Sequence, residues 1–77
     1  MAAIGPDDHE RMVEFELRWY SLGGGPAADI RTEFGVGEAD FFRELDVALG
    51  CTPPRGVPMG VIDDMKRVVR RRLWLVA

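Results

Sequence analysis

The side chains that most often carry catalysis or bind metals are scarce in this sequence. Cys51 is the only cysteine and His9 the only histidine, so they can form neither a disulfide nor a four-ligand zinc site. We expect Cys51 to be a reduced thiol that follows a helix end, at the surface or half-buried. No nucleophile constellation surrounds His9, and the sequence predicts no catalytic residue, no metal and no cofactor.

Two short patterns resemble ligand sites but lack what those sites need. Gly23-Gly24-Gly25-Pro26 has the composition of a phosphate cradle at a helix start, yet the Lys-Ser/Thr pair of a P-loop does not follow it. The pair Asp63 and Asp64 resembles part of a metal site. The two residues fall where a helix is expected to begin, however, and acidic residues there complement the positive helix end. We therefore expect this protein not to be an enzyme.

The strongest chemical signal is a basic, tryptophan-containing face on the last predicted helix. Cations beside an aromatic ring can contact the phosphates and bases of nucleic acid, and Trp and Arg also dominate the binding energy of protein interfaces. A third interpretation is a solvated face on which Arg70 stacks on Trp74, one turn away. All three interpretations stay open. The predicted contact residues, for nucleic acid or for a partner, are Lys66, Arg67, Arg70, Arg71, Trp74 and Arg43.

The charge distribution limits the class of partner. Residues 1–50 hold 11 acidic and four basic side chains, whereas residues 51–77 hold two acidic and six basic ones. This asymmetry excludes a uniformly basic nucleic-acid binder. No apolar run approaches the ~20 residues that a membrane span needs, and the N-terminus has no signal-peptide pattern. We expect a cytoplasmic protein with no membrane partner.

The spacing of apolar residues predicts an all-α fold, a small domain of three to four helices. Helical periodicity indicates helices from about 8 to 22, from 26 to 34 and from 38 to 49, with glycines at their ends. A stretch with three prolines and two glycines separates these helices from the last one. The predicted units are a flexible leader over 1–7, a three-helix core over 8–50, a connector over 51–60 and a basic amphipathic helix over 61–77. Whether that last helix packs on its own domain or on a neighbour is left open.

Two charges interrupt the apolar faces of these helices. Glu16 lies between the apolar stripes of the first helix, and Arg72 lies within the apolar arc of the last. A buried charge is costly unless it is paired, so we expect Glu16 to meet an arginine in the core. The candidate partners are Arg72, Arg31 and Arg43. The apolar side of the last helix is predicted to comprise Val61, Ile62, Met65, Val68, Val69, Leu73, Leu75 and Val76.

The segment 26–49 has the form of a helix-turn-helix. A short helix, a glycine-containing turn and a second helix carry apolar residues at Ile30, Phe34, Val36, Phe41 and Leu45, a spacing that locks such a pair together. This motif often presents its second helix to the major groove of DNA. Here the exposed positions of that helix carry four acids and one base, which repels phosphate and suits a basic protein surface or solvent. They are Glu38, Asp40, Arg43, Glu44 and Asp46.

The same region resembles a family of short actinobacterial proteins of unknown function. The resemblance covers roughly residues 9–50 and rests on three segments: Phe15-Glu16-Leu17-Arg18-Trp19-Tyr20, Ile30-Arg31-Thr32-Glu33-Phe34-Gly35-Val36 and Phe41-Phe42-Arg43-Glu44-Leu45. It implies a helix-turn-helix similar to the promoter-reading region of sigma factors, and it implies no activity. The chain departs from the family in its triple glycine and its proline-rich connector.

These observations favour a non-enzymatic, DNA-associated or transcription-regulatory protein, in which the basic last helix supplies the electrostatic attraction to DNA. The alternative is a protein-interaction module that forms a homodimer or docks another partner. Its docking surface would be the face around Trp74 or the acidic third helix. Salt dependence separates the two, because counterion release weakens DNA binding steeply as salt rises.

Overall fold

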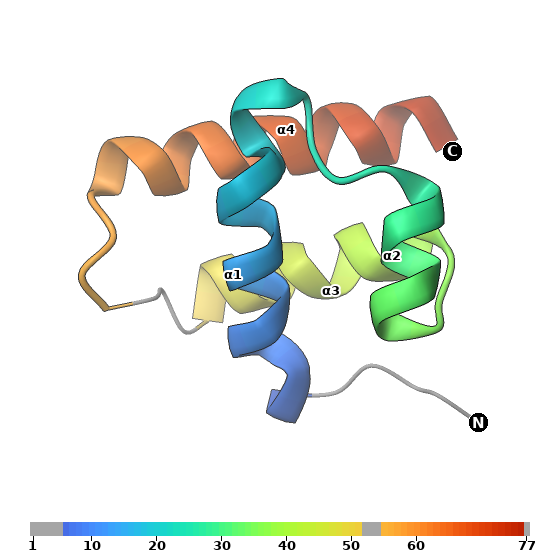
Figure 1. The fold of residues 1–77 in the computed structure, drawn as a ribbon. Coiled ribbons are helices and arrows are strands. Elements are labelled where there is room, and N and C mark those ends of the chain that lie inside the picture. The colour runs from blue at the N-terminus through green and yellow to red at the C-terminus, as the bar shows by residue number, and fades with distance from the viewer. Residues whose placement is uncertain (1–5, 52–54, 77) are drawn as a thin grey trace.

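The computed structural model describes residues 6–51 and 55–76, and it contains helices and no strand in these ranges (Figure 1). The prediction of a small all-α domain is confirmed. The elements are a 3-10 turn η1 (Pro6–Asp8), helix α1 (His9–Trp19), a second 3-10 turn η2 (Tyr20–Leu22), and helices α2 (Ala27–Phe34), α3 (Glu38–Cys51) and α4 (Met59–Val76).

Helix α1 is shorter than predicted. Its regular part ends at Trp19, and the chain tightens into η2 before Gly23, whose N–H bonds the Tyr20 carbonyl at 3.2 Å. The Gly24 N–H donates a second hydrogen bond, 3.0 Å long, to the Trp19 carbonyl. These two bonds satisfy carbonyls that the end of a helix otherwise leaves without a partner. The result is a compact corner that turns the chain toward α2.

Helices α2 and α3 are joined by a short turn over residues 35–37. Pro26 precedes α2, and its carbonyl accepts the Ile30 N–H at 3.0 Å, while Gly35 closes the helix with a 2.9 Å bond to the Arg31 carbonyl. Helix α3 starts with a 3.0 Å bond from Phe41 N–H to the Gly37 carbonyl. The two helices pack against each other. Their use as a DNA-presenting helix-turn-helix stays a prediction.

The predicted boundaries of the leader and the connector need correction. Most of the 1–7 leader lies outside the described residues, but Pro6 and Asp7 already belong to η1. The 51–60 connector is shorter than predicted, because Cys51 ends α3 and α4 begins at Met59, directly after a proline. The Pro58 carbonyl accepts the Val61 and Ile62 N–H groups, so this proline starts the helix. Residues 52–54 and the Cys51 side chain lie outside the described part.

Helix α4 packs on its own domain and completes the core that was predicted for residues 8–50 alone. It lies along α3, and its residues Ile62, Met65 and Val69 are buried. The predicted apolar side of α4 is wrong at Leu75, which is 69% exposed. At about 100° per residue, Leu75 lies more than a quarter turn away from the centre of the arc that Ile62, Met65 and Val69 form, and so it points away from the core.

An aromatic cluster fills the space between α1, α2 and α3. The rings of Phe15 and Phe34 meet edge to face with centroids 5.5 Å apart, and Phe15 and Phe41 do so at 5.4 Å. Phe41 and Phe42 continue the cluster at 5.0 Å. Such arrangements add to the free energy gained by burying the rings. The buried apolar residues are Met12, Val13, Phe15, Ile30, Phe34, Phe41, Phe42, Leu45, Ala48, Leu49, Ile62, Met65 and Val69.

None of the helices in the described part of the chain is both long enough and apolar enough to cross a membrane. The longest, α4, is interrupted on its outer side by charged residues throughout its length.

Candidate functional site

The outer face of α4 is the most strongly basic surface of the described chain. Arg67, Arg70 and Arg71 are exposed, Lys66 is half-buried, and Trp74 is 80% exposed. Arg67 forms an exposed ion pair of 2.8 Å with Asp64. The other three cations have no hydrogen-bond or ion-pair partner among the described residues, so their charge is open to an external anion.

Helical spacing divides this surface into two stripes. At about 100° per residue, Arg67 lies opposite the buried residues of α4, with Trp74 on one side of it and Arg71 on the other, and Arg70 lies beyond Trp74. Arg71 and Leu75 lie on a separate flank, on the same side as Val68, which borders Gly24. One stripe consists of Lys66, Arg70 and Trp74, and the other, with Arg71 and Leu75, adjoins the η2 corner.

The stacking of Arg70 on Trp74 is not formed. Within the described chain the arginines that lie over aromatic rings are Arg11, Arg18 and Arg72, over Phe34, Phe15 and Phe42 respectively. The stacking contact is therefore absent, and a solvated face stays one of the open interpretations. Both side chains remain available to a ligand.

Arg43 does not belong to this basic face. It projects from α3, and its guanidinium pairs with Asp40 at 3.0 Å, with both side chains exposed. It lies on the same helix as the acids that were predicted to repel DNA. Two of these acids contact residues of other helices. Glu38 pairs with Arg72 at 2.6 Å, and Glu44 lies 2.7 Å from His9 Nε2. Glu38 is thus paired with an arginine of α4, and Glu44 contacts a histidine of α1, two long-range contacts that spacing within α3 does not reveal.

Glu16 is completely buried, as its position in the α1 pattern predicted. One carboxylate oxygen, Oε1, accepts the Gly25 N–H at 3.0 Å. The other oxygen, Oε2, is buried without a hydrogen-bond partner. Burial raises the pKa of the Glu16 carboxyl from its ordinary 4.5 to about 7, although the Gly25 hydrogen bond and the charge of Arg72 both act to lower it. Burial therefore favours the protonated form of this group.

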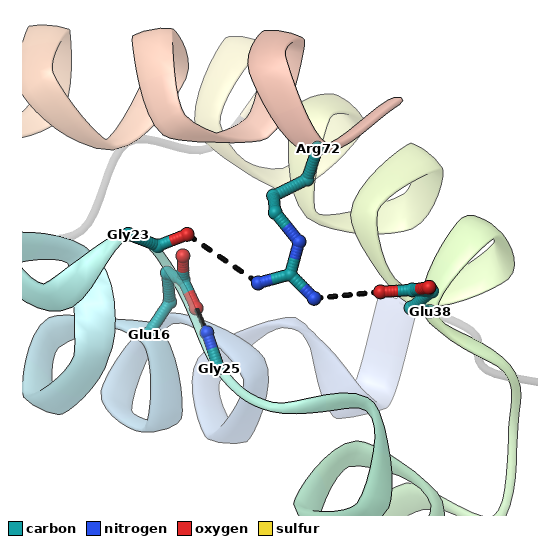
Figure 2. Close-up of polar contacts among 5 residues, drawn as sticks. All are labelled: Glu16, Gly23, Gly25, Glu38 and Arg72. Atoms are coloured by element: carbon teal, nitrogen blue, oxygen red, sulfur yellow. Dashed lines mark hydrogen bonds and ion pairs between the residues drawn. The ribbon is translucent and has the colours of Figure 1, made fainter. Parts of the chain in front are cut away.

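The predicted ion pair between Glu16 and an arginine is not formed among the described residues. The charge of Arg72 lowers the pKa of Glu16, but the Arg72 guanidinium binds other groups, as Figure 2 shows. Its Nη2 pairs with Glu38, and its Nη1 donates to the Gly23 carbonyl at 3.3 Å. Arg31 and Arg43 are exposed on α2 and α3. The backbone of the triple glycine supplies the partner that the sequence had suggested would be an arginine.

A shallow groove between α1 and α2 was not anticipated from the sequence. It has a volume of about 350 Å³ and lies beneath the η2 corner. An Arg18–Glu33 ion pair of 3.6 Å links the two helices across it. The signal that could have revealed it is Leu22, which continues the apolar stripe of α1 past the helix end and is 74% exposed. The lining residues are Phe15, Arg18, Trp19, Leu22, Asp29 and Glu33.

The titratable groups of the described residues are distributed over several elements. In the described residues, no group of three or more His, Cys, Asp or Glu side chains is placed to hold a metal ion. His9 forms a 2.7 Å contact with Glu44, and Glu16 is not among the residues that line the α1–α2 groove. No protein-family model, curated protein or solved structure matches the chain.

Proposed function

We propose that this chain is a cytoplasmic, non-enzymatic DNA-associated protein that contacts nucleic acid through the outer face of α4. The observation that carries the proposal is the set of cations without partners, Lys66, Arg70 and Arg71, next to the exposed ring of Trp74. Phosphate contacts supply most non-specific affinity for DNA. An aromatic side chain beside them offers a stacking surface for an unpaired base or a sugar.

The surrounding charge pattern supports this choice of face. The remaining cations of the first three helices are mostly engaged, since Arg11, Arg18 and Arg43 each pair with an acid. A DNA duplex that approached α3 would meet Asp40 and Asp46 at exposed positions. The basic face of α4 is therefore the surface on which an anionic polymer meets least repulsion. In this proposal the α2–α3 pair acts as scaffold, with a regulatory role in transcription as the functional context.

The proposal is tested by fluorescence anisotropy with labelled random-sequence duplex DNA at low and moderate salt. The test variant carries Lys66→Glu and Arg70→Glu. The matched control carries Arg31→Glu and Arg55→Glu, two exposed cations elsewhere that give the same change in net charge. We expect the test variant to lose about tenfold or more in affinity and about two units of salt slope, since each phosphate contact contributes about 0.9.

Two outcomes would overturn the proposal. One is the absence of DNA binding by the unmodified protein even at low salt. The other is an equal loss in the test and control variants, which would assign the effect to net charge rather than to the α4 face.

A protein interface is the second candidate for the same surface. It is favoured by the 80% exposure of Trp74 one turn from Arg70, because these two residue types are the commonest hot spots of protein interfaces. Binding centred on the Trp74 ring would depend far less on salt than binding to phosphates. A salt-insensitive complex that Trp74→Ala abolishes would favour this candidate over nucleic acid.

A further inference from the structure

Two exposed leucines lie on either side of the η2 corner. Leu22 ends η2 and is 74% exposed, and Leu75 lies on the adjoining flank of α4 and is 69% exposed. The corner and the helix are in contact, because Arg72 Nη1 bonds the Gly23 carbonyl and Val68 borders Gly24. In Figure 1 the segment from η2 to α2 crosses α4 at this point. The two leucines thus belong to one surface of the domain.

This surface carries opposite charges at its two sides. On α4, Arg71 lies one turn before Leu75 on the same flank. On α2, Asp29 lines the groove to which Leu22 also contributes. Neither Arg71 nor Asp29 has a hydrogen-bond or ion-pair partner among the described residues. The surface is apolar in the middle, positive toward α4 and negative toward α2.

We propose that this surface is the interface of a homodimer, in which Leu75 of each copy enters the α1–α2 groove of the other. A two-fold axis brings the same patch of both copies together. Every contact between two different residues across the interface is therefore formed twice, once from each copy. With that symmetry, Arg71 of one copy faces Asp29 of its partner, and the reverse contact forms as well. The proposed interface shares Arg71 with the basic face of α4 but does not include Lys66, Arg70 or Trp74, and it goes beyond the nucleic-acid function.

Charge complementarity is what selects a second copy as the occupant. The groove is lined by apolar side chains and by three charged ones, of which Arg18 and Glu33 pair with each other and Asp29 has no ion-pair partner among the described residues. A ligand for it needs an aliphatic side chain with a cation about one turn away. The Arg71–Leu75 flank has this chemistry, and the same molecule presents it beside the groove. Two such contacts per dimer would bury four leucines that are otherwise in water, which is favourable.

The test is sedimentation equilibrium of the intact chain from micromolar to millimolar concentration. We expect the unmodified protein to approach twice the monomer mass at the upper end. Asp29→Lys and Arg71→Glu should each weaken dimerisation about tenfold, because each places two like charges together twice. The double variant Asp29→Lys/Arg71→Glu restores opposite charges and should recover most of the lost affinity.

Leu22→Glu and Val47→Glu complete the design. Both replace an exposed apolar residue, but Val47 lies on α3, outside the proposed interface. Leu22→Glu should be monomeric and helical by circular dichroism, and Val47→Glu should dimerise like the unmodified protein. The proposal is overturned if the unmodified chain is monomeric throughout, if the double variant is as weak as the single ones, or if Val47→Glu is equally impaired. Because Leu22→Glu leaves the α4 cations intact, its DNA affinity reports the nucleic-acid proposal separately.

Discussion

Glu16 and Arg72 both approach the point where a Cβ atom on Gly24 would stand, 3.0 Å from each, yet no ion pair joins them. Arg72 is engaged by the Glu38 carboxylate and the Gly23 carbonyl, and Glu16 by the Gly25 N–H. The carboxyl group therefore feels the positive charge without a direct contact. Burial prevails, and the pKa of Glu16 stays raised at about 7.

The first prediction concerns the pH dependence of stability. The pKa of Glu16 is about 7 in the folded protein and 4.5 as the ordinary value, so the folded state binds more protons than the unfolded state between these limits. The free energy of unfolding must then fall as pH rises from about 4.5 to 7. At 1.36 kcal/mol per unit, Glu16 contributes a loss of up to about 3 kcal/mol.

Urea unfolding of the unmodified protein and of Glu16→Gln across pH 4 to 8 measures this contribution. The difference in unfolding free energy between the two should move in favour of the glutamine variant as pH rises. A difference that stays constant with pH would show that the pKa of Glu16 is the same in the folded and unfolded states. Glu14→Gln, on the exposed side of the same helix, serves as the control.

The second prediction concerns the packing of the η2 corner. Gly24 has φ +100° and its Cβ position lies 3.0 Å from Arg72, Glu16 and Val68, so Gly24→Ala should destabilise by about 2–4 kcal/mol. Gly23→Ala is the matched control, because φ is +94° but nothing lies within 4 Å of the new methyl. Its free energy of unfolding should fall only by the cost of the backbone strain at positive φ, about 1–2 kcal/mol. Equal losses in thermal unfolding would mean that the methyl at position 24 meets no crowding.

The third prediction separates a partly buried ion pair from an exposed one. Arg72→Ala removes the contact with Glu38 and the cation–π contact with Phe42, whose ring centroid lies 4.6 Å from the guanidinium carbon. We expect a loss of about 2–3 kcal/mol in chemical unfolding. Arg43→Ala, which breaks only the exposed pair with Asp40, should lose less than about 1 kcal/mol. If the two losses were alike, Arg72 would have no special structural role.

The fourth prediction uses the fluorescence of Trp74. Because this ring is 80% exposed and Trp19 is half-buried, acrylamide should quench one emission component readily, and that component should be missing in Trp74→Phe. If α4 contacts nucleic acid as proposed, saturating duplex DNA should protect the same component. Quenching that DNA leaves unchanged, under conditions where anisotropy shows binding, would place the contact on another face.

Local periodicity was enough to predict the helices, because each buried stripe recurs within its own segment. Phe41 and Leu45 on α3 are an example, since their spacing of four residues already assigns them to the core. The helix ends were less predictable. The shift from α1 to η2 and the start of α4 at Met59 depend on hydrogen bonds to Tyr20 and Pro58, and competing choices there differ little in local preference.

The candidate site was predictable only in part, for a related reason. All residues of the α4 face come from one continuous helix, so Lys66, Arg70 and Trp74 could be grouped from the sequence. The pairing of Glu38 with Arg72 joins positions that are 34 residues apart, and helical periodicity carries no information about such partners. The exposure of Leu75 likewise depends on which side of α4 the other helices cover. These are properties of the assembled domain.

The contribution of α4 to the core has a consequence for how the domain is made. Arg72 meets a carbonyl 49 residues earlier in the chain, and Ile62, Met65 and Val69 cover the side of α3 on which α4 lies. A ribosome delivers these residues after α1, α2 and α3 have been synthesised. Until they emerge, the nascent chain exposes apolar surface of α3, including Phe42, and offers a binding site to chaperones. Cooperative folding can therefore be completed only once α4 has left the exit tunnel.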